Sequence, residues 1–193
     1  MALSVTLALT AYIPQQLLRN SKPKIVFAGR SNVGKSSLLN ALCGQNLAKI
    51  SSKPGKTQSV NYYQVTGHDF YLVDLPGYGY AEASKDQRDS WRALLDAFFG
   101  NEENLICVCV LLDARLPPQD KDLQMIRYAQ ERDYRVRGIM TKADKCSKSM
   151  LAERMQTWIT ILKNPPIVTS AKNKQGIGDV RSMLLNLVGE KAQ

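Results

Sequence analysis

The sequence predicts an α/β fold in which a mostly parallel central sheet carries helices on both faces. Apolar runs of strand length alternate along the chain with segments whose apolar residues recur at helical spacing. The longest apolar run, 105–112, contains no polar positions, as expected of a strand that is buried on both faces. A glycine-rich loop also joins the strand expected at 24–28 to the helix expected at 35–43.

The other elements are predicted by the same two spacings. Further strands are expected at 60–66, 70–73, 135–140 and 167–169. Further helices are expected at 86–99, 119–132, 149–163 and 180–188. Polar residues, glycines and prolines predict loops at 45–59 and after residue 74, and His68, the only histidine, is expected in a surface turn.

Length and composition predict one globular domain of 193 residues, 44% of which are hydrophobic and 22% charged. We expect the body of the domain at 24–189, an N-terminal arm or extra strand packed on it at 1–23, and a short tail at 190–193. The apolar start, 1–13, is too short to span a bilayer. It lacks a basic region, so a cleaved signal peptide is the weaker alternative.

The charge balance points to an anionic partner. The formal net charge is +9, which favours a nucleic acid or a membrane surface, although a merely solvated basic surface is the alternative. The four cysteines lack C-x-x-C spacing, so neither a metal site nor a redox site is indicated. Cys107 and Cys109 are interpreted as small core residues, and all four cysteines are expected to be reduced in a cytoplasm.

Residues 24–43 contain a phosphate-binding motif. Gly29, Gly34, Lys35 and Ser36 fit the pattern G-x-x-x-x-G-K-[ST]. The glycines let the backbone approach an anion, and the helix that begins near Lys35 directs N–H groups and its positive dipole end toward it. Lys35 is placed to add charge on the β- and γ-phosphates, and the Ser36 hydroxyl is placed to ligate Mg²⁺. An ordinary glycine-containing turn is the weaker interpretation.

Three later motifs lie at strand ends and favour a guanine nucleotide. Asp74-x-x-Gly77 offers a carboxylate that can hold Mg²⁺ through water and an N–H that can meet a γ-phosphate. In Thr141-Lys142-x-Asp144, the Asp144 carboxylate can accept hydrogen bonds from both guanine N1–H and the 2-amino group. Adenine lacks this donor pair and would leave the carboxylate without partners. The Lys142 stem can lie over the base, and a backbone N–H at 170–172 can meet guanine O6.

With these motifs, the chain resembles the Ras-like GTPase superfamily and, within it, the bacterial EngB family. The resemblance rests on GRSNVGKSSLLNAL (29–42), PGKTQ (54–58), LVDLPGYGYA (72–81) and TKADK (141–145) and covers roughly residues 12–188. It implies a three-layer G domain of the P-loop NTPase type. It also implies slow, Mg²⁺-dependent hydrolysis of GTP to GDP and phosphate by a switch in large ribosomal subunit assembly, needed for normal bacterial growth, cell division and septation.

The resemblance assigns site residues by position. The residues implied to bind the nucleotide are Gly29, Arg30, Ser31, Asn32, Val33, Gly34, Lys35 and Ser36 in the phosphate loop, Gly55, Lys56, Thr57, Gln58 and Ser59 in a first switch, Asp74, Leu75, Pro76 and Gly77 at the head of a second switch, and Thr141, Lys142, Ala143, Asp144, Thr169, Ser170 and Ala171 around guanine. Ser36, Thr57 and Asp74 are implied to hold Mg²⁺. Lys35, Thr57 and Gly77 are the implied catalytic residues.

Three positions need separate comment. Tyr78 stands where Ras-type enzymes carry a water-orienting glutamine, which predicts slow intrinsic hydrolysis that depends on something else, such as a partner. Asn32 matches an asparagine that binds K⁺ in some related GTPases, although a loop-bracing hydrogen bond is an equal alternative. Lys56 replaces the usual arginine, so it is not predicted to be catalytic. Tyr78 and Tyr80 can stack on a base or a protein or be buried against a helix.

These residues are compatible with three functions. The first is the ribosome-assembly switch, a cytoplasmic monomer whose GTP-bound form contacts the rRNA and proteins of the large ribosomal subunit, with no DNA or membrane partner. The second is a signalling or trafficking GTPase with a protein or membrane partner; the absence of a lipidation motif at either end argues against it. The third is a small-metabolite kinase, which would leave the motif at 141–144 unexplained.

Overall fold

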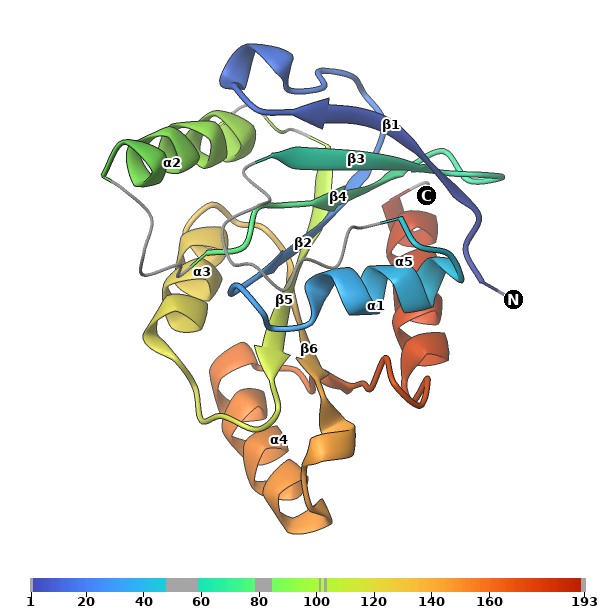
Figure 1. Cartoon of the computed structure of the whole chain (residues 1–193), viewed down its shortest axis with the longest axis vertical. Helices are drawn as coiled ribbons and strands as arrows, with labels where there is room; N and C mark the ends of the chain where they lie inside the picture. The colour runs from blue at the N-terminus through green and yellow to red at the C-terminus, as the bar shows by residue number, and fades with distance from the viewer. Residues whose placement is uncertain (1, 48–58, 79–84, 101, 103, 192–193) are drawn as a thin grey trace.

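A seven-stranded sheet forms the centre of the computed structural model, which describes residues 2–47, 59–78, 85–100, 102 and 104–191 (Figure 1). Its strands are β1 (Val5–Ala11), β2 (Lys24–Gly29), β3 (Val60–Val65), β4 (Tyr71–Asp74), β5 (Leu105–Asp113), β6 (Val136–Thr141) and β7 (Ile167–Val168). They lie in the order β1-β3-β4-β2-β5-β6-β7. The β1–β3 and β3–β4 pairs are antiparallel and the remaining neighbours are parallel, so the predicted, mostly parallel sheet is confirmed.

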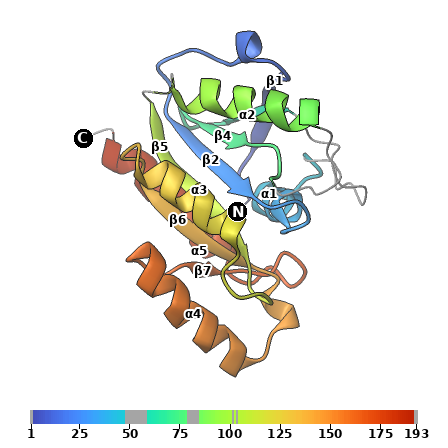
Figure 2. The same ribbon diagram turned by 90° about the vertical axis from the view of Figure 1, so that its left-hand side faces the viewer.

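Helices cover both faces of this sheet, as the sequence predicts (Figure 2). They are α1 (Lys35–Cys43), α2 (Lys85–Gly100), α3 (Asp120–Gln130), α4 (Lys148–Leu162) and α5 (Ile177–Lys191), with short 3₁₀ turns at Pro14–Gln16 and Ala143–Lys145. One hydrophobic core lies between the sheet and α1 with α5, and a second lies between the sheet and α2, α3 and α4. The result is a three-layer α/β domain.

Strand β5 lies between these two cores. Cys107, Cys109 and Leu111 belong to the core beneath α1 and α5, whereas Val108 and Val110 belong to the opposite core. All five side chains are 0% exposed, which confirms the prediction of a strand buried on both faces. The four cysteines are free, and Cys43, Cys107 and Cys109 are buried.

Most expected element boundaries differ from the structure by one to three residues, and two of these differences have a clear backbone cause. Helix α5 begins at Ile177 and not at residue 180, because Gly176 adopts the left-handed conformation (φ 69°) immediately before it and Ile177 is already packed in the core. Helix α4 ends at Leu162, and Lys163 forms a left-handed cap (φ 59°) that the apolar spacing did not indicate. His68 is exposed in the turn between β3 and β4, as expected.

The N-terminal residues form an edge strand. Val5 pairs with Val65 and Ala11 with Val60, so β1 runs antiparallel to β3, with a shift of register between Leu7 and Leu9. The two residues that follow β1 are exposed: Tyr12 is 63% exposed and Ile13 is 50% exposed. Where a separate arm ends and the body of the domain begins stays a prediction. Among the described residues, no helix is both long enough and apolar enough to cross a membrane.

The first residue of β2, Lys24, is fully buried, which the apolar strand pattern did not indicate. Its ammonium donates to Glu102 Oε1 at 2.9 Å and to the carbonyl oxygens of Asn20 and Lys22 at 3.1 and 3.2 Å. A buried ion pair of this kind stabilises little by itself, but loss of one partner leaves the other charge buried and uncompensated.

We therefore expect Glu102→Ala to lower the free energy of unfolding by about 3 to 5 kcal/mol. Urea denaturation at neutral pH measures this loss, with an unchanged m-value as evidence for the same native state. The matched control is Glu153→Ala, which removes a 68% exposed partner of Arg154 and should cost less than about 1 kcal/mol. A similarly small loss for Glu102→Ala would contradict the prediction.

Candidate nucleotide-binding site

The phosphate motif lies in a tight loop between β2 and α1. Gly29 ends β2, and a Cβ atom there would lie 2.8 Å from Val33 Cγ1, so glycine allows the loop to fold back on the strand. Gly34 has a φ of 107° immediately before Lys35 begins α1. The described loop thus presents the N-terminus of α1 to an anion, which is the geometry that the motif predicts.

The second predicted motif is placed against this loop. Asp74 ends β4, which pairs with β2 so that Asp74 lies beside Phe27. The Lys35 ammonium donates directly to Asp74 Oδ1, and both side chains are buried, at 9% and 3% exposure. A Cβ atom on Gly77 would lie 3.3 Å from the main chain of Ser31. Lys35, Asp74 and Gly77 are therefore together, although the chain separates Lys35 from Asp74 by 39 residues.

The third motif follows β6 and contacts the same loop. The Thr141 hydroxyl donates to the Val33 carbonyl at 2.7 Å, and the Lys142 ammonium donates to the Asn32 carbonyl at 2.5 Å. Asp144 is exposed, and its Oδ1 accepts the Ser170 hydroxyl at 2.6 Å. This hydrogen bond, together with Lys172 and Lys145, lowers the pKa of Asp144, so the side chain is a carboxylate at neutral pH.

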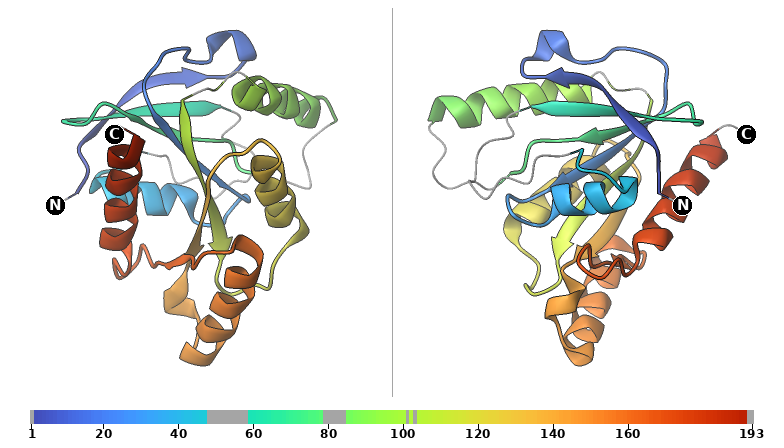
Figure 3. Two further views of the ribbon diagram at one scale, coloured as in Figure 1. Left: turned by 180° about the vertical axis from the view of Figure 1, so that it is seen from behind. Right: turned by 45° about the vertical axis from the view of Figure 1, so that its right-hand side comes forward.

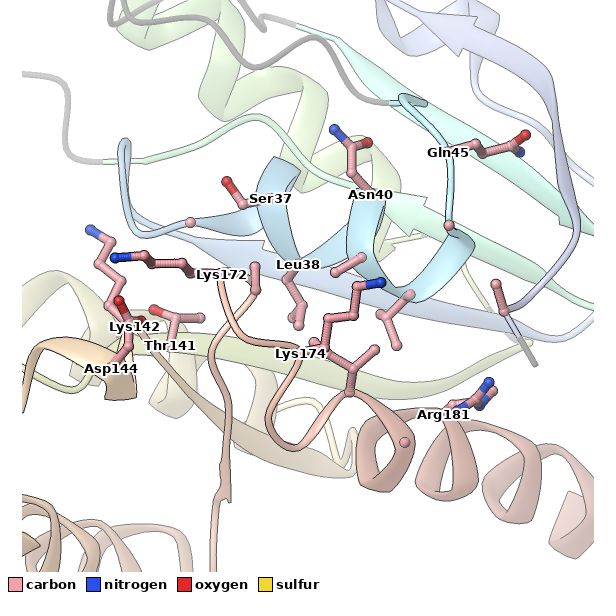
Figure 4. A pocket seen from close by; sticks show the side chains of 18 of the residues that line it. Ser37, Leu38, Asn40, Gln45, Thr141, Lys142, Asp144, Lys172, Lys174 and Arg181 are labelled. Carbon is pink, nitrogen blue, oxygen red and sulfur yellow. The ribbon is translucent and has the colours of Figure 1, made fainter.

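Thr141, Lys142 and Asp144 line one end of an open cleft of about 950 Å³. Figure 4 shows Thr141, Lys142, Asp144 and Lys172 close together at that end, below the first turns of α1. Ala171 also lines the cleft. At this end the Asp144 carboxylate can bind the edge of a purine base, and the aliphatic stem of Lys142 can lie against the face of the base. The small residue Ala171 leaves room for the carbonyl side of the base.

Other predicted site residues have supporting positions. Thr169 is buried, and its hydroxyl donates to the Met140 carbonyl at 2.9 Å. The Ala143 N–H donates to the Thr169 carbonyl at 3.1 Å, which joins the two guanine segments. Leu75, Pro76 and Ser59 are buried and are not among the described residues that line the cleft. Gly55, Lys56, Thr57 and Gln58 lie outside the described residues.

The side chains of Arg30 and Tyr78 point away from the phosphate loop toward α3. The Tyr78 hydroxyl donates to Asp122 Oδ1 at 3.0 Å, and Arg30 Nε lies 3.4 Å from Asp122 Oδ2. Tyr78 is only 5% exposed, so burial against a helix is shown and the stacking role considered for it is wrong for this structure. Tyr80 lies outside the described residues. Burial and the neighbouring Asp122 raise the pKa of Tyr78 well above its ordinary value.

The main chain of Tyr78 also contacts the phosphate loop. Its N–H donates to the Gly29 carbonyl at 3.2 Å, and its carbonyl accepts the Ser31 N–H at 2.9 Å. We expect Tyr78→Phe to lower the free energy of unfolding by about 1 to 3 kcal/mol, because Asp122, 2% exposed, loses a buried hydrogen-bond donor. Urea denaturation measures the effect. Tyr12→Phe, at a 63% exposed tyrosine, is the control and should be neutral; equal stability of both variants would contradict the expectation.

Sequence reasoning missed Asp113, a buried carboxylate at the carboxyl end of β5. It accepts the Lys142 ammonium at 2.8 Å and the Arg115 guanidinium at 2.9 and 2.7 Å. Burial alone would raise its pKa, but the hydrogen bonds from Arg115 and Lys142 lower the pKa to about 2. Asp113 thus holds Lys142 in place as a permanent anion. The signal was present, because an acid directly after an unbroken apolar strand lies at the same edge as the other motifs.

The fold and the site define a P-loop GTPase domain, with a phosphate loop after β2, an aspartate at the end of β4 and a guanine-type carboxylate after β6. Residues 24–142 match the family described as 50S ribosome-binding GTPase. The probable GTP-binding protein EngB of Desulfovibrio desulfuricans is 46% identical over 190 residues, which cover 98% of this chain and 94% of the relative. That of Thermotoga maritima is 39% identical and covers 88% of each chain. The chain belongs to the EngB family of GTP-binding proteins.

Solved structures show the same fold. A crystal structure of a probable GTP-binding protein EngB has a TM-score of 0.71 at 22% identity and covers 86% of this chain and 99% of that chain. Aquifex aeolicus Era, solved with GDP and AlF₄⁻, has a TM-score of 0.70 at 19% identity over 85% of this chain and 56% of that chain. At these identities the likeness supports the G-domain architecture, and the residue roles rest on the geometry of this chain.

Proposed function

We propose that this protein binds GTP, hydrolyses it slowly to GDP and phosphate, and acts in its GTP-bound form in the assembly of the large ribosomal subunit. The observation that supports this proposal most directly is that the candidate phosphate site and the candidate guanine site lie at the same edge of the sheet. The Lys35–Asp74 contact lies at the start of α1, and the Asp144–Ser170 contact lies at the end of β6. The family description, which names a 50S ribosome-binding GTPase, supports the partner.

In this proposal each group has one task. The N-terminus of α1 and the Lys35 ammonium hold the phosphates, and Asp144 accepts the two guanine donors while Ser170 keeps its carboxylate oriented. Asp113 holds the Lys142 ammonium so that the stem can lie over the base. Gly77 and Thr57 are proposed to meet the γ-phosphate from the two switch segments, and loss of that phosphate on hydrolysis would release both contacts.

The donor groups near the phosphate loop fit Mg²⁺. Among the described residues, no three His, Cys, Asp or Glu side chains gather as a metal-binding set. The Asp74 carboxylate and the Ser36 hydroxyl are, however, the hard oxygen donors that Mg²⁺ takes in small number together with phosphate oxygens and water. We propose these two residues and Thr57 as its protein ligands. When bound, the ion would neutralise charge on the phosphates.

Slow hydrolysis has a structural reason in this proposal. The Tyr78 phenol, which follows Gly77, is held by Asp122 in the core and cannot orient an attacking water. No amide or carboxylate from this position is therefore available for that task. We propose that a partner, when bound, supplies the missing element, and that the protein is a cytoplasmic monomer needed for normal growth, cell division and septation.

A bound K⁺ beside Asn32 is a further part of the proposal. Asn32 has an exposed side chain and a left-handed backbone (φ 63°), a conformation in which asparagine is enriched, so backbone geometry is an additional reason for asparagine here. We expect faster GTP turnover in KCl than in NaCl at equal ionic strength. Asn32→Gly keeps the left-handed conformation and should lose this difference while nucleotide binding is retained. Equal wild-type rates in the two salts would exclude the ion.

Sedimentation with purified large ribosomal subunits tests the proposed function. We expect the protein to pellet with the subunits in a non-hydrolysable GTP analogue, to remain in solution in GDP, and to dissociate progressively as salt is raised. Equal pelleting in both nucleotides would indicate nonspecific cationic binding. No pelleting in either nucleotide would favour the alternative, a signalling or trafficking GTPase with a protein or membrane partner.

A further inference from the structure

The cleft extends well past the residues that would read guanine. It continues between α1 and α5, which lie side by side on one face of the sheet (Figure 3). Its far end is lined by Gln45 and Asn46 after α1 and by Lys174, Gly178 and Arg181 around the start of α5. The nine residues of α1 span about 13 Å. Since the phosphates belong at the N-terminus of α1, a nucleotide leaves this far end uncovered.

The lining of the cleft has a strong excess of positive charge. Five cationic side chains, those of Lys142, Lys145, Lys172, Lys174 and Arg181, face a single carboxylate, Asp144. Lys142 is already held by Asp113. Lys174 and Arg181 differ from it, because no carboxylate of the described residues lies within 4.0 Å of either. Figure 4 shows Lys172, Lys174 and Arg181 in a row below α1.

The uncharged lining residues indicate which polyanion suits this row. Ser37, Asn40, Gln45 and Asn46 add hydroxyl and amide groups, which can bond phosphate oxygens and ribose hydroxyls. No aromatic side chain is among the described residues that line the cleft, so a platform for stacked bases is missing there. The lining also includes the apolar residues Leu38, Leu42 and Ile177, but each of these is at most 8% exposed. The accessible cations and amides, without aromatics, are suited to a sugar–phosphate backbone.

We propose that this basic cleft, defined by Lys172, Lys174, Arg181, Gln45 and Asn46, binds the phosphodiester backbone of RNA beside the guanine site. The inference rests on the proposed function, since it names the part of the surface that would contact rRNA. Recognition is through phosphates, so binding is tolerant of sequence and falls steeply with salt.

The experiment compares three full-length proteins in the non-hydrolysable GTP analogue. They are the wild type, Lys174→Gln/Arg181→Gln, and the control Lys121→Gln/Arg127→Gln, which removes the same charge from exposed positions of α3 on the opposite face of the sheet. Each is titrated with protein-free rRNA extracted from large subunits and with intact large subunits. A fluorescent GTP analogue verifies that nucleotide affinity is equal in all three.

We expect the cleft variant to bind protein-free rRNA roughly 10- to 100-fold more weakly than the wild type at 0.1 M salt. The slope of the logarithm of the binding constant against the logarithm of the salt concentration should become shallower by about one for each cation removed. The control variant should differ little from the wild type. Equal weakening in both variants would overturn the proposal, because it would reflect net charge alone. Weakened subunit binding with unchanged rRNA binding would also overturn it, in favour of a ribosomal protein partner. Failure of the wild type to bind subunits would refute the proposed function, while the titration with protein-free rRNA would still test the cleft.

Discussion

Replacement of Asp144 by asparagine is expected to shift nucleotide preference from GTP toward xanthosine triphosphate. The carboxylate can accept both guanine N1–H and the 2-amino group, while Ser170 occupies another lone pair of Oδ1. Asparagine offers one acceptor and one donor. Its amide would face the guanine amino group as donor to donor, whereas xanthine presents a carbonyl oxygen at that position. The lost complementarity should weaken GTP binding on the order of 100-fold.

Competition of GTP, xanthosine triphosphate and ATP against one fluorescent nucleotide measures this change. The matched control is Asp133→Asn, because it removes the same charge from an exposed residue whose left-handed backbone (φ 58°) asparagine tolerates. The control should keep the wild-type order of affinities. Unchanged GTP affinity in Asp144→Asn would show that Asp144 does not read the base, and a gain in ATP affinity alone would point to a different binding pose.

The second large effect is expected from Lys35→Ala, which should lower kcat/KM for GTP by a factor of about 100 to 1,000. The ammonium would be lost from the phosphates, where charge develops during hydrolysis. The same substitution leaves the Asp74 carboxylate, 3% exposed, without its ion-pair partner. A drop of about 3 to 5 kcal/mol in the free energy of unfolding should therefore accompany the kinetic loss.

A double-mutant cycle separates these two effects. Lys35→Ala/Asp74→Ala removes both charges, so its unfolding free energy should recover part of the loss seen in the single variants, with a coupling energy above about 1 kcal/mol. Its GTPase activity should not recover, because the phosphates still lack their cation and Mg²⁺ lacks a carboxylate. Additive stability losses would show that the Lys35–Asp74 contact does not stabilise the fold, and recovered activity would remove Lys35 from the catalytic groups.

The phosphate loop and the strand-end motifs could be predicted from sequence because each is a short, local segment. The pattern at 29–36 specifies a bend, a helix start and a cation within eight residues, and alternation with apolar runs specifies the strands around it. The roles of these residues toward GTP and Mg²⁺ remain predictions. The structure shows their hydrogen-bond partners: Lys35 donates to Asp74, and Asp144 accepts the Ser170 hydroxyl.

The buried charge contacts could not be predicted, because their partners are distant in the chain. Lys24 and Glu102 are 78 residues apart, and Tyr78 and Asp122 are 44 apart. Which side chains meet depends on the strand order and on the side of the sheet that each helix covers. A local sequence pattern indicates neither the strand order nor the side. The sequence indicates for Asp122 only an acidic residue in the first turn of a helix, where acidic residues are common. Only the packed sheet shows that it joins the phosphate loop to the second switch.

The pairing of β1 has a consequence for the way the chain folds as it is synthesised. Val5 can find Val65 only after some sixty further residues have been added, and β3 in turn needs β4 and β2 as its support. Strand β1 therefore leaves the synthesising ribosome well before the strands that it needs for pairing. In the interval, a seven-residue segment rich in Leu, Thr and Ala has unpaired backbone groups that a chaperone or a neighbouring nascent chain can capture.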